Sequence, residues 1–270
     1  MKKKVLGIFT CFNRKEKTVN CLKSLIAGNE EVEFTFLAVD DGSTDGTEEA
    51  LRDMRQVAVL TGNGSLFYSG GMRLGIRKAK EQYQGYDYCL LFNDDVEFYP
   101  GVIERMAAQC GDGILVGATC DTEGNLSYGG VRKASGFRPK FDIVMSGEKP
   151  VSCDTFNANC VLIPYDIFLK LPNIDEAYTH SLGDFDYGLT ASQMGYAIYP
   201  TNFFVGCCND NPVGKTWRDT SLSRKERWKR KESPKGLPTG EWFHFVRKNF
   251  GLISACYSSM TPMLRILLGK

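Results

Sequence analysis

The chain has 270 residues, 43% of them hydrophobic, which suits one large globular domain or two small ones. Its 33 Lys and Arg balance 32 Asp and Glu, and no nucleic-acid motif accompanies them, so binding of DNA or RNA is excluded. The basic start precedes an apolar run too short for a signal peptide, and no segment approaches the about 20 apolar residues that span a bilayer. We expect a soluble protein whose membrane contact, if any, is peripheral.

The ten cysteines are scattered without a C-x-x-C pair, and most lie inside apolar runs. This spacing argues against a zinc or redox centre and favours buried thiols over disulfides, in a reducing compartment such as the cytoplasm. The cysteines are Cys11, Cys21, Cys89, Cys110, Cys120, Cys153, Cys160, Cys207, Cys208 and Cys256.

Apolar runs alternate with helical spacing through the first hundred residues. Such alternation predicts a mostly parallel sheet with helices on both faces. A glycine-rich stretch around Gly64 to Gly71 precedes the third helix, and Thr44 is the expected cap of the second. The predicted strands are 5–10, 34–39, 57–60 and 88–92, and the predicted helices are 15–27, 48–54 and 72–79.

The pattern changes after Pro100, and this half should be mixed rather than purely parallel. A glycine-rich stretch over 121–149 predicts hairpins. The fold class expected is α/β, with a Rossmann-like, mostly parallel sheet flanked by helices and a basic helical segment at the C-terminus. The elements expected here are helices at 102–109 and 182–194 and strands at 114–118, 157–163 and 197–200.

Two acidic clusters each follow an apolar strand. Asp40 and Asp41 end the second strand and lead into a Gly-Ser-Thr turn, where Asp45 and Thr47 are best explained as turn and capping residues. An aspartate at the first cluster can accept a hydrogen bond from a base or a ribose. Because open α/β folds bind ligands at the carboxyl ends of their strands, the site should lie there.

The second cluster, Asn93-Asp94-Asp95, has little to offer an apolar core. Magnesium and manganese take one or two carboxylates and complete their shells with phosphate oxygens and water. We therefore expect Asp95 to hold a divalent metal and Asp94 to face a ribose.

Two further segments carry polar groups that could serve chemistry. Thr10 to Arg14 follows the first strand, where Phe12 could stack on a base, although an ordinary turn with Asn13 as helix cap explains the same residues. Asp184 and Asp186 begin a predicted helix two residues apart, so their side chains diverge and only one can point into a cleft. A general base beside an acceptor hydroxyl needs one such carboxylate, although these residues alone are better explained by Asp184 as the cap of the helix.

These motifs in this order resemble family 2 glycosyltransferases of the GT-A fold, in their rhamnosyltransferase-like branch. The resemblance covers about residues 5–205. It rests on Thr10-Cys11-Phe12-Asn13-Arg14, Val39-Asp40-Asp41-Gly42-Ser43-Thr44-Asp45, Asn93-Asp94-Asp95 and Gly183-Asp184-Phe185-Asp186.

The resemblance implies inverting transfer of a sugar from a nucleoside diphosphate sugar, UDP- or dTDP-linked, to a hydroxyl of a glycan or lipid-linked glycan in cell-surface polysaccharide synthesis. It implies Asp184 as catalytic base and Asp95 as ligand of Mn²⁺ or Mg²⁺, with His180 and Asp186 assigned to the acceptor side. The residues expected at the nucleotide sugar are Thr10, Phe12, Asn13, Arg14, Asp40, Asp41, Gly71, Arg73, Asn93 and Asp94.

This chain departs from the family pattern at two places. Arg73 stands where many relatives have Asn, so it either touches the diphosphate or only covers the sheet. The stretch 206–210 lacks the histidine that many relatives place there as a metal ligand, which leaves the third ligand open. His244 is expected to belong to the C-terminal segment.

The resemblance divides the chain into a transferase domain over 1–206 and a basic, amphipathic extension over 207–270. The nucleotide-binding half is about 1–100 and the acceptor-binding half about 101–206. In the extension, the basic stretch from Lys215 to Lys235 with its tryptophans either attracts an anionic membrane surface at the inner face of the plasma membrane or is a solvated helical face.

Two alternative functions remain. A sugar nucleotidyltransferase would need a glycine-rich loop where Cys11-Phe12-Asn13 stands, and a catalytically silent nucleotide-sugar-binding module would not need both Asp95 and Asp184. A haloacid-dehalogenase-type phosphatase is excluded, because Val39 occupies the first position of the Asp-x-Asp-Gly motif that it requires.

Overall fold

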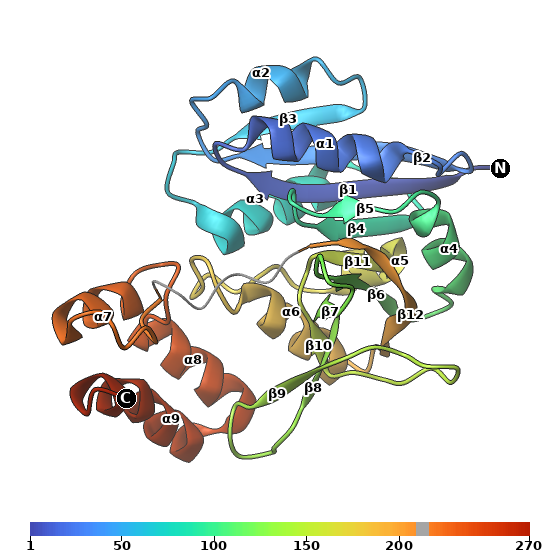
Figure 1. Cartoon of the computed structure of the whole chain (residues 1–270). Helices are drawn as coiled ribbons and strands as arrows, with labels where there is room; N and C mark the ends of the chain where they lie inside the picture. The colour runs from blue at the N-terminus through green and yellow to red at the C-terminus, as the bar shows by residue number, and fades with distance from the viewer. Residues whose placement is uncertain (209–215) are drawn as a thin grey trace.

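The computed structural model describes residues 1–208 and 216–270. Its main sheet runs in the order β3-β2-β1-β4-β11-β6-β12-β5, with β7 paired to β6 (Figure 1). The first four strands in this order are parallel to one another. They alternate with helices along the chain: β1 (Lys3–Cys11), α1 (Lys15–Ile26), β2 (Val32–Asp40), α2 (Thr47–Arg52), β3 (Val57–Thr61), α3 (Phe67–Gln82) and β4 (Tyr88–Phe92).

The second half of the sheet is mixed, as the sequence predicts. Strand β11 is antiparallel to both of its neighbours, β12 is parallel to β6, and β5 and β7 are antiparallel edge partners. A smaller sheet has the order β10-β8-β9. The elements are β5 (Glu97–Phe98), α4 (Val102–Gln109), β6 (Ile114–Cys120), β7 (Leu126–Tyr128), β8 (Gly130–Lys133), β9 (Phe141–Val144), β10 (Thr155–Phe156), β11 (Cys160–Pro164), α5 (Tyr165–Lys170), α6 (Gly183–Gln193) and β12 (Ile198–Cys207).

Helices cover both faces of the sheet because its central strands are apolar on both sides. Leu22 of α1, Leu51 of α2 and Met106 of α4 pack into one cluster, and α3, α5 and α6 contribute to the cluster on the opposite face. Helix α3 lies very close to β1, since a Cβ at Gly75 would come within 2.7 Å of Ile8 Cγ2. This close approach fixes the start of α3 beside the strand ends.

Three further helices lie within residues 216–270: α7 (Arg224–Lys231), α8 (Thr239–Phe250) and α9 (Leu252–Leu267). Figure 1 shows them grouped beyond α6, away from β3. Lys248 of α8 forms ion pairs with Asp186 (2.6 Å) and Asp175 (3.4 Å), and Phe245 packs in a cluster with Tyr178 and Leu189. The C-terminal helices are therefore attached to α6 and to the segment that precedes it.

Pro262 lies inside α9, where it removes the N–H that would bond to the Ser258 carbonyl. Trp242 of α8 supplies the missing donor, because its Nε1 lies 3.1 Å from Ser258 O. The interruption in one helix is thus compensated by the other, which fixes which side of α9 faces α8.

The α/β class and the alternation of the first half are confirmed, with differences at element ends. Helix α2 begins at Thr47 after Gly46, whose φ is 83°, and Thr44 does not cap it; Asp45 instead accepts from the Thr47 N–H at 3.1 Å. Helix α3 starts at Phe67, five residues earlier than expected. The short elements β5, β10 and α5 were not predicted, because segments of two to six residues carry too little periodicity.

All ten cysteines are thiols, and eight of them are buried, as expected from their apolar surroundings. Within the two described ranges, no helix has the length and apolar character needed to cross a membrane.

Candidate functional site

The carboxyl ends of β1, β2 and β4 lie at one edge of the sheet. Cys11 pairs with Asp40, and Ile8 pairs with Leu91 in the parallel register, so the loops after these strands emerge side by side. The two acidic clusters, more than 50 residues apart in sequence, therefore border one site.

Asp94 and Asp95 converge on a single cation. Arg14 Nη1 lies 3.0 Å from Asp94 Oδ1 and 3.0 Å from Asp95 Oδ2, and the Thr18 hydroxyl donates to Asp94 Oδ2 at 2.8 Å. Asp94 is only 4% exposed, and burial raises its pKa although Arg14 and Thr18 oppose the rise. Burial lowers the pKa of Arg14, but the two carboxylates outweigh it and raise that pKa overall.

The same pair of carboxylates suits a hard divalent cation. Two carboxylate oxygens already meet at one positively charged atom, and Mg²⁺ or Mn²⁺ needs one or two protein carboxylates when a phosphorylated ligand supplies further oxygens. Among residues 1–208 and 216–270, no group of three or more His, Cys, Asp or Glu side chains is placed to hold a metal. Asn209 and Asp210, in the stretch where a further ligand was sought, lie outside the described residues.

Asp40 and Asp41 differ in how they are engaged. Asp40 Oδ1 accepts from the Ser43 N–H at 2.6 Å, while its buried Oδ2 has no partner among the described residues. An unpaired buried acceptor at a strand end is costly, so a ligand donor at this atom would relieve it. Asp41 accepts from the N–H groups of Gly64 (2.9 Å) and Phe67 (3.0 Å), which orders the loop that leads into α3.

The loop after β1 forms the rim of the site. Asn13 has a φ of 50°, its N–H donates to Ser43 Oγ at 2.8 Å, and its Oδ1 accepts from the Thr44 N–H at 2.7 Å. Asn13 therefore ties this loop to the loop after β2. Helix α1 begins without a side-chain cap, so the alternative role of Asn13 as N-cap is not seen. Phe12 is 49% exposed beside these loops.

Thr10 and Gly71 are placed against each other. The Thr10 hydroxyl donates to Val39 O at 3.1 Å, and a Cβ at residue 71 would overlap that hydroxyl. Glycine at this position thus lets the first turn of α3 approach the end of β1. Both residues lie at the edge of the sheet where they were expected.

Asp184 lies in the first turn of α6, in the second half of the chain. Its Oδ2 accepts from the Ala158 N–H at 3.2 Å and its Oδ1 from the Phe185 N–H at 2.9 Å, while burial raises its pKa above the ordinary value of an aspartate. Ala158 is followed by Asn159, whose Oδ1 accepts from Asn93 Nδ2 at 3.2 Å. Asp184 is therefore linked to the second acidic cluster through two adjacent residues.

His180 packs at the same place as a neutral imidazole. Its Nδ1 accepts from the Tyr68 N–H at 3.4 Å, and its carbonyl accepts from the Ser69 hydroxyl at 2.9 Å. Burial, with the charges of Lys235 and Arg14, lowers its pKa to about 4. An uncharged ring here holds the start of α3 against the loop before α6.

Two predicted site residues, Arg73 and Asp186, are engaged elsewhere. Arg73 donates to the carbonyls of Asp175 (2.8 Å) and Tyr178 (3.2 Å), so it orders the loop before α6 and does not extend to the acidic clusters. Asp186 is buried against Lys248 and Asn249 of α8, on a different side of α6 from Asp184. His244 pairs with Asp175 at 3.0 Å, within the C-terminal segment as expected.

Asn93 begins a chain of polar contacts that crosses to β11 and β12. Its Nδ2 donates to Asn159 Oδ1 at 3.2 Å, Asn159 Nδ2 contacts Cys208 Sγ at 3.5 Å, and that sulfur lies 4.0 Å from Asp95 Oδ1. Asn93 is thus connected to Asp95 through Asn159 and Cys208. Sequence reasoning missed Thr18, Tyr68 and Asn159, since an isolated Thr, Tyr or Asn carries no motif of its own.

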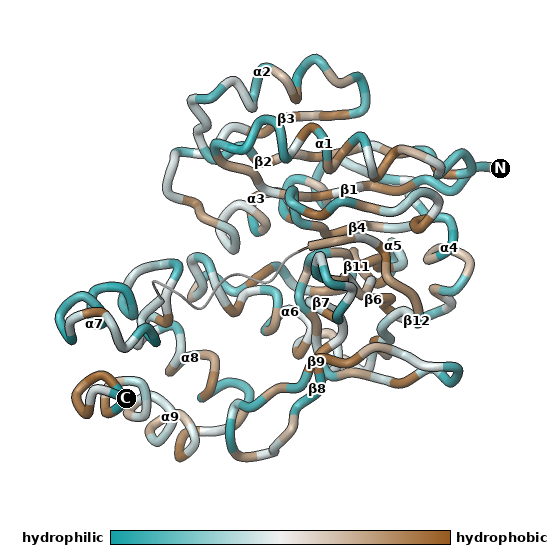
Figure 2. The backbone as a smooth tube through the Cα atoms, viewed as in Figure 1, coloured by the Kyte–Doolittle hydropathy of each residue, from teal (hydrophilic) through white to brown (hydrophobic). Residues whose placement is uncertain are grey.

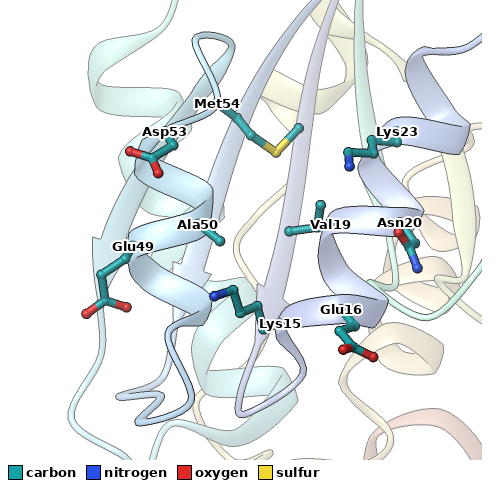
Figure 3. Close-up of a pocket in the computed structure, with 9 residues that line it drawn as sticks. All are labelled: Lys15, Glu16, Val19, Asn20, Lys23, Glu49, Ala50, Asp53 and Met54. Atoms are coloured by element: carbon teal, nitrogen blue, oxygen red, sulfur yellow. The ribbon is translucent and has the colours of Figure 1, made fainter.

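A separate pocket lies between α1 and α2, outside this edge (Figure 3). Its lining comes from these two helices and the residues that follow α2: Lys15, Glu16, Val19, Asn20, Lys23, Glu49, Ala50, Asp53 and Met54. Acidic and basic groups are mixed in this lining, and none of the residues assigned to the site at the strand ends belongs to it.

Comparisons with known proteins identify the family and the fold of the chain. The family model described as "Glycosyl transferase family 2" matches residues 8–156. The chain is similar over its whole length to 73% of a mannosyltransferase, PcManGT from Pyrobaculum calidifontis, solved with GDP-Man and Mn²⁺, at a TM-score of 0.58 and 11% identity. Over 86% of its length it resembles 48% of GalNAc-T7, solved with UDP, GalNAc and Mn²⁺, at a TM-score of 0.58 and 10% identity. No curated protein matches the sequence.

Proposed function

Since the chain belongs to glycosyl transferase family 2 and is a glycosyltransferase, we propose that it transfers a sugar, with inversion, from a nucleoside diphosphate sugar to a hydroxyl of a glycan or lipid-linked glycan. The observation that carries the proposal is the position of Asp184, which Ala158 and the adjacent Asn159 link to the second acidic cluster and whose raised pKa suits a general base. Binding alone would not require a carboxylate on that side of the site.

The donor is held by the edge of the parallel half. The unpaired Asp40 Oδ2 accepts from the base, the exposed ring of Phe12 stacks on it, and Asp94 faces the ribose. Asp95 holds Mn²⁺ or Mg²⁺, which when bound offsets the negative charge of the departing diphosphate. Both similar structures carry Mn²⁺, which supports this assignment.

Asp184 acts on the acceptor. It takes the proton of the acceptor hydroxyl as that oxygen attacks the anomeric carbon from the face opposite the diphosphate. The N–H groups of Ala158 and Phe185 hold the carboxylate in one orientation, which keeps it aimed at the acceptor. We assign His180, whose Nδ1 accepts from the Tyr68 N–H at 3.4 Å, to the acceptor side of the site.

Finer assignments follow from the sequence motifs. We propose a UDP- or dTDP-linked donor, a hexosyl- or rhamnosyltransferase activity in the rhamnosyltransferase-like branch, and a cytoplasmic role in cell-surface polysaccharide synthesis. Residues 1–206 would form the transferase domain and 207–270 an accessory extension. The similar proteins bind GDP-Man in one case and UDP with GalNAc in the other, which supports a nucleotide-sugar donor.

The test separates binding from transfer. Donor binding is measured by thermal stabilisation with UDP-, dTDP- and GDP-sugars with and without Mn²⁺, and transfer by release of nucleoside diphosphate with an acceptor panel. Asp184→Asn should keep the stabilisation and lose about 10²- to 10⁴-fold in turnover. Asp166→Asn is the matched control, because Asp166 is also an aspartate in a first helical turn but is 69% exposed on α5.

Two outcomes contradict the proposal. If wild type binds a donor but releases no diphosphate with any acceptor, the chain is a binding module and not a transferase. If Asp184→Asn loses donor binding together with turnover, Asp184 belongs to the donor site and is not the base.

A further inference from the structure

The outward face of α9 is apolar along its whole length. Its exposed positions recur at spacings of three or four residues and therefore form one stripe. Ile253 is 78% exposed, and the only charged side chain in the helix, Arg265, is near one margin. The stripe consists of Ile253, Cys256, Tyr257, Met260, Leu264, Leu267 and the following Leu268.

This orientation of α9 is fixed by the protein. Ala255, Ser258, Ser259, Pro262 and Ile266 are buried on its inner side, and Trp242 holds the Ser258 carbonyl. The helix buries mostly small residues and leaves its large apolar residues outside, the reverse of what folding alone favours. Figure 2 shows α9 at the margin of the molecule, away from the main sheet.

The tip of the β8–β9 hairpin extends the stripe. Phe137 is 48% exposed, its ring lies 6.3 Å from that of Tyr257, and Ser254 Oγ donates to its carbonyl at 2.5 Å. Arg138 lies over the Tyr257 ring at 5.6 Å. A second exposed aromatic residue and a basic side chain are thus added beside α9. We call α9's stripe together with Phe137 the apolar face.

Basic side chains border the other end of the apolar face. Helix α7 is attached to the end of α9, because the buried Arg227 donates to Trp217 O (2.8 Å) and to Lys270 O (2.6 Å). Ser223 caps α7 through the Glu226 N–H at 3.2 Å, which fixes where its outward side points. That side carries exposed Arg224, Lys225 and Lys229 together with Trp228, which is 40% exposed.

The net charge of residues 216–270 is opposite in sign to that of residues 1–215. Residues 216–270 contain 12 Lys and Arg against 4 Asp and Glu, a formal charge of +8, whereas residues 1–215 contain 21 against 28, a formal charge of −7. Two copies meeting through this face would bring their basic borders together, which costs free energy. An anionic surface with an apolar interior matches both the stripe and its border.

We propose that the apolar face of α9 and Phe137, bordered by the basic side of α7, binds the surface of a bilayer that contains anionic lipids. The large apolar side chains enter the boundary between headgroups and acyl chains while Arg224, Lys225 and Lys229 contact anionic headgroups. The helix lies in the plane of the membrane and does not cross it.

Sedimentation with lipid vesicles tests the surface without donor or acceptor, so its result is independent of the transferase reaction. The full chain should bind phosphatidylcholine vesicles that contain phosphatidylglycerol, bind pure phosphatidylcholine at least about tenfold more weakly, and dissociate as salt is raised. Ile253→Asp with Leu264→Asp, and separately Lys225→Glu with Lys229→Glu, should each reduce binding at least about tenfold. Leu169→Asp, at a 40% exposed leucine on α5, should bind as wild type does.

Each variant is checked for an unchanged thermal unfolding curve. If the α9 pair fails to fold, the α7 pair still tests the proposal, because it leaves the apolar face unchanged. Equal binding to neutral and anionic vesicles, or equal loss in Leu169→Asp, would overturn the proposal. A wild-type dimer that dissociates in the α9 variant while no vesicle binding is seen would assign the face to a second copy instead.

Discussion

Arg14 Nη1 lies 3.0 Å from an oxygen of Asp94 and 3.0 Å from an oxygen of Asp95, so one guanidinium nitrogen contacts both carboxylates. Asp95 is also the proposed metal ligand. Arg14 and the metal are therefore alternative counter-ions for Asp95, and a metal that binds there must compete with this guanidinium.

Arg14→Ala tests this competition. Without metal, the variant should lose about 1–3 kcal/mol of unfolding free energy, because the buried Asp94 keeps Thr18 but loses its charged partner. Mn²⁺ should then raise the melting temperature of the variant more than that of wild type, since no guanidinium competes. Thermal unfolding over a series of MnCl₂ concentrations measures both effects.

Arg52→Ala is the control, because Arg52 pairs with Glu48 at the exposed surface of α2, away from Asp94 and Asp95. Its stability should change little and its response to Mn²⁺ not at all. If Mn²⁺ raises the melting temperature of wild type and of Arg14→Ala by the same amount, the metal does not bind at the carboxylates that Arg14 contacts.

Gly70 and Gly71 are neighbours in α3, and replacing each with alanine should affect stability in a different way. Alanine at 71 would overlap the Thr10 hydroxyl and move α3 away from the end of β1, whereas the nearest side-chain atom to a Cβ at 70 is Leu66 Cβ at 3.4 Å. Gly71→Ala should destabilise the protein by about 1–3 kcal/mol, and Gly70→Ala should be neutral or stabilise it by up to about 1 kcal/mol. Denaturant unfolding of both variants decides the order, and equal effects would mean that α3 does not depend on the close approach.

The fold was largely predictable because each strand and helix of the parallel half is encoded locally. Strand 88–92 and helix 102–109 were predicted with the bounds that the structure has, since turn residues and apolar spacing mark both ends. The beginning of α3 was predicted too late, because Phe67 to Gly71 resembles a loop in sequence and becomes helical by packing against β1 and His180.

The candidate site was predictable only where a residue belongs to a motif. Asp40, Asp94 and Asp184 were found in this way, but what each contacts depends on residues far away in the chain. Arg73 was assigned to the nucleotide sugar and in the structure orders the loop at 175–178, which is about 100 positions away. Asp186 was assigned to the acceptor, and its Lys248 partner comes from a helix that sequence reasoning did not place against α6.

The pH dependence of transfer follows from the raised pKa of Asp184. A general base works only when deprotonated, so turnover should fall as the pH drops through this pKa, which lies above the ordinary aspartate value because of burial. Turnover under saturating donor and acceptor should therefore decline at a higher pH than about 3.9, the value of an unperturbed aspartate.

Protein stability changes in the same direction and has to be separated from catalysis. The folded-state pKa of His180 is lowered from 6.5 to about 4, so between these values the unfolded chain binds a proton that the folded chain does not, and stability decreases as the pH falls. His180→Gln should show a smaller decrease in melting temperature over this range. If turnover of wild type declines only in parallel with its melting temperature, and the decline shifts in His180→Gln, then unfolding limits the rate at low pH and the pH profile does not report Asp184.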